Sequence, residues 1–228
     1  MELIIIIIAI IAILIIYLMM KMNIEEMKKI ALEPELNTIA QKYPRNTEIA
    51  KTVLEKLGNK TTKIEENENL EATLYLAIQD KILIGNTHDS YTRIQTIAHE
   101  CLHSIQDRKM LIFNFIYSNI YFIYYAIICI LVIFRRLTNE ILYSNIFLIL
   151  SFIYYTVRVF LENDAMIKAK YLAKEYMEEQ KCATKNEIER VIHGFEQLNK
   201  GCIKGTNCSL FIEIMVKLVI FNALALIF

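Results

Sequence analysis

Two histidines and a glutamate lie close together in the segment Ala98-His99-Glu100-Cys101-Leu102-His103. If this segment is helical, His99 and His103 are one turn apart on the same face, so both imidazoles can reach a single metal ion. Glu100 lies beside them and can hold the water molecule of such an ion. Zinc lowers the pKa of a bound water toward about 7, and a neighbouring carboxylate can pass that proton to a leaving amine. The spacing therefore predicts a zinc site with peptidase chemistry, in which Glu100 is the base.

The same pattern also arises by chance on solvated helix faces. The chain has 4 histidines among its 228 residues, and two of them form this pattern. Such sparse use of histidine favours a metal-binding pair over two unrelated side chains.

A catalytic zinc ion usually has three protein ligands, so a third must come from elsewhere in the chain. His88 is too close to the start of the helix to be favoured, and His193 lies in an amphipathic stretch, residues 186–198, that is typical of a surface or core histidine. Glu162 and Asp164 directly follow an apolar segment, where an acidic pair can also be a solvated helix start. Because two histidines and a carboxylate are a recurring zinc set, the two acidic residues are the better candidates.

The rest of the chain has the composition of a membrane protein, with 55% hydrophobic and 22% charged residues. Four apolar stretches have the length needed to cross a bilayer, at residues 3–20, 110–134, 141–160 and 209–228. The first stretch has no basic segment before it and no small-residue cleavage site after it, so we expect a retained anchor rather than a signal peptide. In the last stretch, Glu213 and Lys217 are four residues apart and are expected to pair on one helix face.

Four spans would place residues 21–109 and 161–208 on the same side of the membrane. Lysine and arginine near the spans concentrate on that side, whereas the short turn on the other side has Arg135 and Arg136. The positive-inside rule therefore predicts a multi-pass protein of the cell membrane with its catalytic segments in the cytoplasm. Five cysteines without regular spacing fit a reducing compartment. The net formal charge of zero gives no indication of a nucleic-acid partner.

The first segment between spans contains the elements that must hold the two histidines. We expect a charged helical stretch at residues 24–42 that is interrupted by Pro34, and a helix at residues 47–57 with Thr47 as N-cap and Gly58 as stop. A polar loop at residues 65–69 and two short strands at residues 73–78 and 81–84 should follow. The histidine helix is expected at residues 91–107, capped by Ser90. The two strands would form a hairpin that either pairs with an extended peptide or supports the helix.

The predicted fold is mainly α and integral to the membrane, with four transmembrane helices and a small α+β, zincin-like catalytic domain at the cytoplasmic face. The predicted parts are an anchor at 1–20, a soluble segment with the histidine helix at 21–109, and two transmembrane helices with a short turn at 110–160. They are followed by a soluble helical segment with the third ligand at 161–208 and a last transmembrane helix at 209–228. The segment at 161–208 includes a predicted helix at 166–179.

The order of these parts resembles the bacterial membrane-bound neutral zinc metallopeptidases of the YugP type. The resemblance covers nearly the whole chain and is most specific at residues 98–106 and at Glu162-Asn163-Asp164-Ala165. It implies one zinc ion per chain, held by His99, His103 and Glu162, with Glu100 as the catalytic base. Asp164 would be an outer partner or the alternative ligand. HtpX-type peptidases share the histidine pattern, but the short Glu-x-Asp-Ala spacing and the span order argue against that lineage.

The chain departs from this family next to its second histidine. The family usually has glycine there, whereas this chain has Leu102, so a different neighbour of the helix is expected. Cys101 is two residues from His99 along the helix and should point away from the metal as a small buried side chain.

The expected function is hydrolysis of peptide bonds in membrane-proximal or unfolded proteins at the bilayer surface. Tyr91, His88 and His193 are the candidate donors to the oxyanion of the transition state. Two alternatives remain, a zinc-binding membrane scaffold with weak or no activity, and a membrane interaction protein in which the histidine pattern is accidental.

Overall fold

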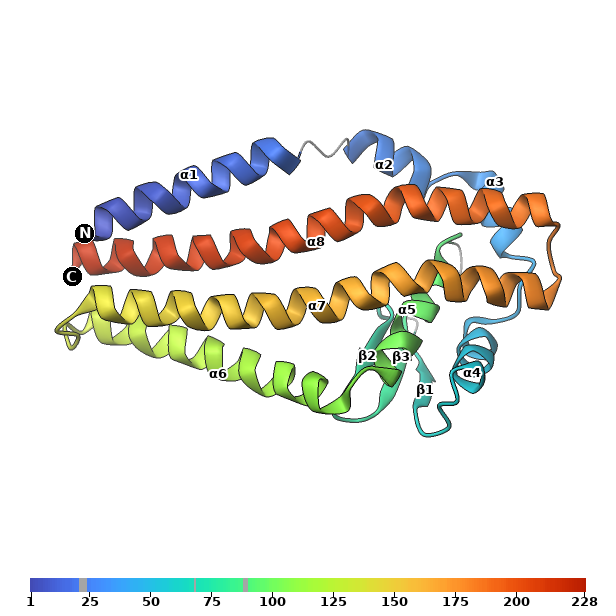
Figure 1. Ribbon diagram of the computed structural model, residues 1–228, viewed down its shortest axis with the longest axis horizontal. Helices are drawn as coiled ribbons and strands as arrows, with labels where there is room; N and C mark the ends of the chain where they lie inside the picture. The colour runs from blue at the N-terminus through green and yellow to red at the C-terminus, as the bar shows by residue number, and fades with distance from the viewer. Residues whose placement is uncertain (21–23, 68, 88–89) are drawn as a thin grey trace. The chain divides into compact units, whose positions relative to one another are not determined.

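The computed structural model covers residues 1–228 and describes all of them except residues 21–23, 68 and 88–89. The described chain is mainly helical and has one small sheet (Figure 1). Its elements in chain order are α1 (Glu2–Met20), α2 (Ile24–Ala31), α3 (Pro34–Ala40), α4 (Asn46–Lys56), β1 (Lys63–Glu66), β2 (Leu74–Leu76), β3 (Lys81–Ile84), α5 (Arg93–Ile105), α6 (Arg108–Ile133), α7 (Glu140–Gln180) and α8 (Lys185–Ile227).

The sheet has the strand order β1-β3-β2. β2 pairs antiparallel with β3, with Tyr75 opposite Ile82, which confirms the predicted hairpin. β1 pairs parallel with β3, so the predicted polar loop at residues 65–69 is wrong in its first two residues. The sequence pattern did not indicate this strand, because its side chains are mostly exposed and its pairing with β3 uses backbone groups. Glu65 contributes an ion pair with Lys81 of β3, at 2.7 Å.

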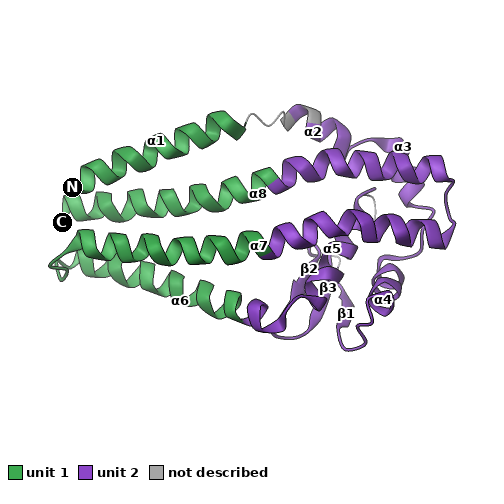
Figure 2. Cartoon of the chain, viewed as in Figure 1, with its two compact units in different colours: residues 1–22, 113–160, 204–228 green, residues 23–112, 161–203 purple. Residues whose placement is uncertain are grey.

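The described chain divides into two compact units (Figure 2). Unit 1 comprises residues 1–22, 113–160 and 204–228, and unit 2 comprises residues 23–112 and 161–203. Helices α6, α7 and α8 contribute to both units.

The two long helices differ from the sequence prediction in their continuity. The predicted helices at residues 166–179 and 186–198 are not separate elements, because each belongs to a helix that also contains an apolar span. No proline interrupts either helix, so the backbone hydrogen bonding continues where the side chains change from apolar to charged.

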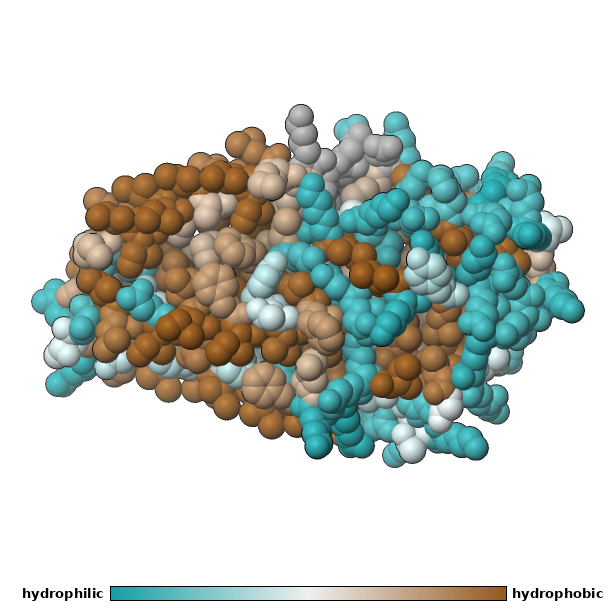
Figure 3. All heavy atoms as spheres, viewed as in Figure 1, coloured by the Kyte–Doolittle hydropathy of each residue, from teal (hydrophilic) through white to brown (hydrophobic). Residues whose placement is uncertain are grey.

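Unit 1 is built from apolar helices. In the described residues, four helices are long and apolar enough to cross a membrane, namely α1, α6, α7 and α8, as predicted. Large hydrophobic side chains are exposed along these helices, and hydrophobic residues dominate the surface of unit 1 on the face shown in Figure 3. The predicted pair of Glu213 and Lys217 is confirmed, at 2.5 Å.

Unit 2 has an ordinary hydrophobic core beneath a largely hydrophilic surface (Figure 3). Pro34 separates α2 from α3, as predicted. Helix α4 packs against α5 and the sheet, and its buried face includes Ile49 and Val53. Gly58 follows α4 with φ of 72°, a left-handed conformation that glycine adopts without strain, which confirms it as the stop.

The start of α4 differs from the prediction. The helix begins at Asn46 and its N-cap is Arg45, so Thr47 lies inside the first turn instead of capping it. The side chain of Asn46 points inward and accepts a hydrogen bond from the guanidinium of Arg93, at 2.7 Å. This inward contact links α4 to the beginning of α5.

Candidate metal centre

Helix α5 carries the two histidines and is held by its apolar face. Ile94, Ile97, Ala98 and Cys101 are completely buried in the core of unit 2. His99 and His103 are one turn apart on another face of the helix. This face points away from α4, because the core residues occupy the side of α5 that packs against α4. The burial of this apolar face therefore fixes the direction in which both imidazoles project.

The helix begins two residues later than predicted, at Arg93. Its N-cap is Thr92, and no side chain caps the helix there. The hydroxyl of Ser90 instead accepts a hydrogen bond from the backbone N–H of Thr92, at 3.2 Å, so Ser90 stabilises the turn before the helix.

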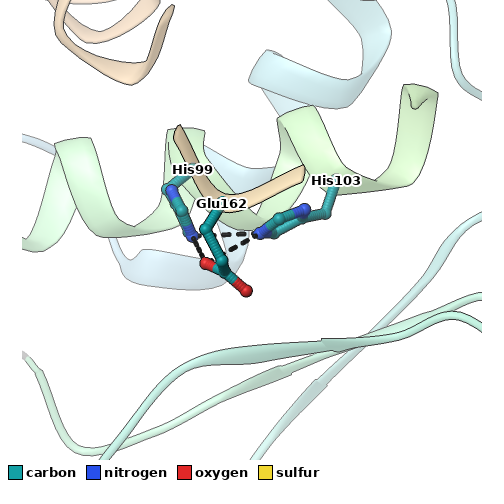
Figure 4. Close-up of side chains that lie close together, drawn as sticks. All are labelled: His99, His103 and Glu162. Atoms are coloured by element: carbon teal, nitrogen blue, oxygen red, sulfur yellow. Dashed lines mark hydrogen bonds and ion pairs between the residues drawn. The ribbon is translucent and has the colours of Figure 1, made fainter. Parts of the chain in front are cut away.

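The structure brings His99, His103 and Glu162 together, with their side chains pointing toward one another (Figure 4). The Nε2 atoms of the two histidines are 3.1 Å apart. The Oε2 atom of Glu162 lies 3.5 Å from Nε2 of His99 and 3.7 Å from Nε2 of His103. Among the described residues, these three form a group that could hold a metal ion.

The distances within this group fit a metal site. Nitrogen and oxygen ligands lie at about 2.0–2.2 Å from a transition-metal ion such as zinc. The point equidistant from the three facing atoms of His99, His103 and Glu162 lies about 2 Å from each of them. Two imidazoles and one carboxylate also leave a coordination position for water or substrate. The three atoms are therefore spaced as the ligands of one metal ion would be.

Glu100 lies next to this group and is almost completely buried. Its Oε2 atom accepts a hydrogen bond from the backbone N–H of Tyr75 in β2, at 2.6 Å. Its Oε1 atom lies 3.9 Å from Nε2 of His99. Burial raises the pKa of the Glu100 carboxyl above its usual range, although the two imidazoles oppose the shift. A carboxyl anchored through one oxygen, with a raised pKa, is suited to accepting and returning a proton.

Electrostatics at His103 favour a positive charge in this group. Burial by itself would lower the pKa of this imidazole, but the carboxylates of Glu162 and Glu100 outweigh burial and raise it. A site that attracts a proton onto its imidazole also attracts a metal cation to the same lone pair.

Gln106, directly after α5, fixes the tautomer of His103. The Nε2 atom of Gln106 donates to the carbonyl of Leu161, at 2.9 Å, and to Oδ2 of Asp164, at 3.2 Å. Its Oε1 atom must then face Nδ1 of His103, at 2.8 Å, so this nitrogen carries the hydrogen. The Nε2 lone pair of His103 is thereby turned toward His99 and Glu162.

Asp164 lies outside the group of possible metal ligands. One of its oxygens accepts from Gln106, and the other forms an ion pair with Lys168 at 2.6 Å. The arrangement favours Asp164 as an outer partner that supports Gln106, rather than as the alternative ligand.

The described candidates for an oxyanion donor, Tyr91 and His193, are not part of the metal group. His193 is exposed on α8, in a surface depression shared with Arg190. Tyr91 is completely buried in the core of unit 2. His88 lies outside the described residues. None of the described candidates is therefore favoured as an oxyanion donor.

The two residues that depart from the YugP pattern are both part of the core. The Sγ atom of Cys101 lies 3.8 Å from the carbonyl oxygen of Ala50, which confirms that Cys101 points away from the histidines. Leu102 is also buried in the core cluster. Both residues therefore contribute to the packing of α5 rather than to its polar face.

Sequence reasoning missed the supporting roles of Gln106 and the Tyr75 backbone. Gln106 is three residues after His103, and a polar side chain just past a helix end can turn back toward the last turn. That spacing was the available signal. No sequence signal indicated the role of the Tyr75 N–H, because the direction of this group depends on how the hairpin packs beside α5.

Comparison of the chain with protein-family models, with curated proteins and with solved structures finds no match. The function must therefore be inferred from the residues of the chain itself.

Proposed function

We propose that the protein is a membrane-bound zinc metallopeptidase that hydrolyses peptide bonds in membrane-proximal or unfolded proteins. The observation that carries this proposal is the convergence of His99, His103 and Glu162 beside the anchored carboxyl of Glu100. The sequence resemblance to the YugP-type metallopeptidases implies the same ligands and the same base.

His99, His103 and Glu162 would hold the zinc ion. When bound, zinc acts as a Lewis acid that activates water and polarises a peptide carbonyl. Gln106 keeps Nε2 of His103 free to bind by holding the hydrogen on Nδ1. Asp164 in turn helps to hold Gln106 in place.

Glu100 would move the proton during hydrolysis. Its Oε2 atom is held by the Tyr75 N–H, so Oε1 is the atom that takes a proton from the attacking water. Glu100 then gives this proton to the leaving nitrogen, which completes cleavage of the C–N bond. Burial raises the pKa of this carboxyl above its usual range, which favours acceptance of the proton.

The edge of the sheet positions the proposed catalytic carboxyl. β2 is an edge strand, and it pairs with β3 along one side. The N–H of Tyr75 is directed to Glu100, so the other side of β2 runs beside the proposed catalytic carboxyl. This bond occupies the N–H of Tyr75, so the edge of β2 fixes the catalytic carboxyl rather than offering that donor to a substrate backbone.

The four apolar helices support attachment to a lipid bilayer. We place the protein in the cell membrane as a multi-pass protein, with unit 2 in the cytoplasm. Lysine and arginine are concentrated in the segments that form unit 2, in agreement with the positive-inside rule.

The test is Glu100→Gln in purified, zinc-reconstituted protein in detergent, with unfolded protein substrates and cleavage followed by mass spectrometry. Loss of the base should lower the rate by about 10²–10⁴-fold while zinc content stays at the parent level. The matched control is Glu55→Gln, because Glu55 is exposed on α4 and should leave the rate unchanged.

Equal cleavage by the parent and Glu100→Gln would contradict the proposed role of Glu100. Stoichiometric zinc in a parent that cleaves none of the substrates would favour the alternative function, a zinc-binding membrane scaffold.

A further inference from the structure

A cavity of about 270 Å³ opens in unit 2 beside the metal group. Helices α5, α7 and α8 form its wall, and His99 is one of the lining residues. The cavity therefore begins at a residue that the proposed function places on the metal.

The wall extends from the metal group along two helices. Thr92 and Thr96 line the cavity, seven and three residues before His99 on α5. Met166 and Ala169 line it from α7, four and seven residues after Glu162. Residues with these spacings share one helix face, so the cavity lies along the same faces that carry the two ligands.

The lining is mainly apolar. Five of its side chains are hydrophobic, namely Met166, Ala169, Phe195, Leu198 and Cys202. Among the described residues around the cavity, none carries a carboxylate, an ammonium or a guanidinium group. Because a charge without a partner is costly in such surroundings, the cavity favours an uncharged occupant.

Most polar side chains in the wall already have partners inside the chain. The amide of Asn199 donates to the carbonyl of Met166, at 2.9 Å. The amide of Gln95, in the orientation that satisfies it, donates to the carbonyls of Tyr91 and Thr92, at 3.1 Å each. The hydroxyl of Thr92 is 2.7 Å from that of Ser90. Because these groups are already hydrogen-bonded within the chain, they do not require a polar ligand in the cavity.

We propose that this cavity is the subsite that receives a large apolar side chain of the peptide substrate, next to the bond that is cut. This inference rests on the proposed peptidase function. An apolar cavity of about 150 Å³ can hold a benzene ring, so one of 270 Å³ has room for the side chain of phenylalanine, leucine or methionine. A peptide held at the metal by its carbonyl would present a neighbouring side chain to the wall that contains His99.

Cleavage of a peptide library by the zinc-reconstituted parent, read by mass spectrometry, tests the preference. One position beside the cut should be enriched in phenylalanine, leucine and methionine and depleted in aspartate and lysine. Peptides with phenylalanine at that position should have a kcat/KM at least about 10-fold above those with alanine.

Thr96→Phe should reduce that preference, because Thr96 is half-buried in the wall and a ring there narrows the cavity. The ratio of kcat/KM for phenylalanine over alanine peptides should fall by about 10-fold. The matched control is Thr52→Phe, a half-buried threonine on α4 that does not line the cavity. If Thr96→Phe fails to fold, Met166→Ala enlarges the cavity from the opposite wall and should shift the preference toward larger side chains.

Binding separates the subsite from catalysis. Fluorescence anisotropy with labelled phenylalanine and alanine peptides is measured on Glu100→Gln, alone and combined with Thr96→Phe. Tighter binding of the phenylalanine peptide, lost with Thr96→Phe, supports the subsite even if the parent cleaves nothing and the peptidase proposal fails. Cleavage and binding without side-chain preference overturn the subsite and leave the peptidase proposal standing. Equal binding of both peptides, together with Thr96-dependent binding of a fluorescent fatty acid, would assign the cavity to a lipid acyl chain and overturn the proposal.

Discussion

The beginning and the end of helix α5 both bury polar side chains in unit 2, but the two clusters are satisfied in different ways. At the beginning, the guanidinium of the buried Arg93 donates to Asn46 and to the carbonyls of residues 40, 43 and 44, at 2.7–3.1 Å. At the end, ligand atoms of His99, His103 and Glu162 lie within 4.8 Å of one another. The first cluster pairs donors with acceptors inside the chain, whereas the second brings together side chains that can all ligate one metal ion.

This difference separates a structural network from a binding site. A buried polar group that is paired within the chain stabilises the fold, because leaving its partner unpaired is costly. A group of converging acceptors stabilises the fold when something else supplies the positive charge.

Arg93→Met should have the largest effect on stability. It removes the donor to Asn46 and to the carbonyls of residues 40, 43 and 44. The carbonyl of Ala40 still accepts from the N–H of Tyr43, so three groups lose their partner, and at about 1–3 kcal/mol for each we expect a loss of about 3 kcal/mol or more. Thermal unfolding in detergent measures the change. The matched control is Arg45→Met, since Arg45 is exposed and its loss should cost under about 0.5 kcal/mol.

The comparison also predicts that Arg93→Met leaves zinc content per folded chain at the parent level. If Arg93→Met were as stable as the parent, the Arg93 cluster would not be a stabilising network. If it lost zinc while still folded, the Arg93 cluster would also contribute to metal binding.

Gln106→Leu should weaken metal binding without removing a ligand. It removes the acceptor for Nδ1–H of His103 and the contact with the carbonyl of Leu161, and loss of such outer partners typically costs 10–100-fold in affinity. Zinc affinity by competition with a chelating dye measures the effect. Gln106→Glu keeps an oxygen facing Nδ1 and should lose less. Equal affinities in the parent and Gln106→Leu would show that the tautomer is fixed without Gln106.

Asn222→Leu should have the smallest effect. In unit 1, the buried amide of Asn222 donates to the hydroxyl of Ser144, at 3.0 Å. Interhelical hydrogen bonds of this kind contribute about 0.6 kcal/mol in membrane proteins. Unfolding by a denaturing detergent measures the change, with Asn145→Ala as the exposed control. A loss of several kcal/mol would show that unit 1 depends on buried polar contacts as strongly as unit 2 does.

Local spacing predicted much of the fold and half of the site. Long apolar runs predicted the four apolar helices, and the four-residue spacing of His99 and His103 predicted that their imidazoles would share a face. Both inferences depend on geometry within one helix, which the sequence expresses directly.

What the sequence did not predict depends on contacts between distant segments. The parallel pairing of β1 is an example, since exposed Glu65 and Glu66 resemble loop residues until the backbone of β3 is beside them. The role of Gln106 is another, because its partners Leu161 and Asp164 belong to α7. The position of Glu162 also depends on α7 packing beside α5, so the sequence left Asp164 open as the alternative ligand.

Metal stoichiometry on the full chain, purified in detergent and reconstituted with zinc, tests the central claim most directly. The parent, His103→Ala and Glu162→Ala would be compared by elemental analysis, with Glu175→Ala as an exposed acidic control on α7. We expect about one zinc ion per chain in the parent and the control, and loss of the ion in both ligand variants. Absence of zinc from the reconstituted parent, or its full retention in both ligand variants, would contradict the account.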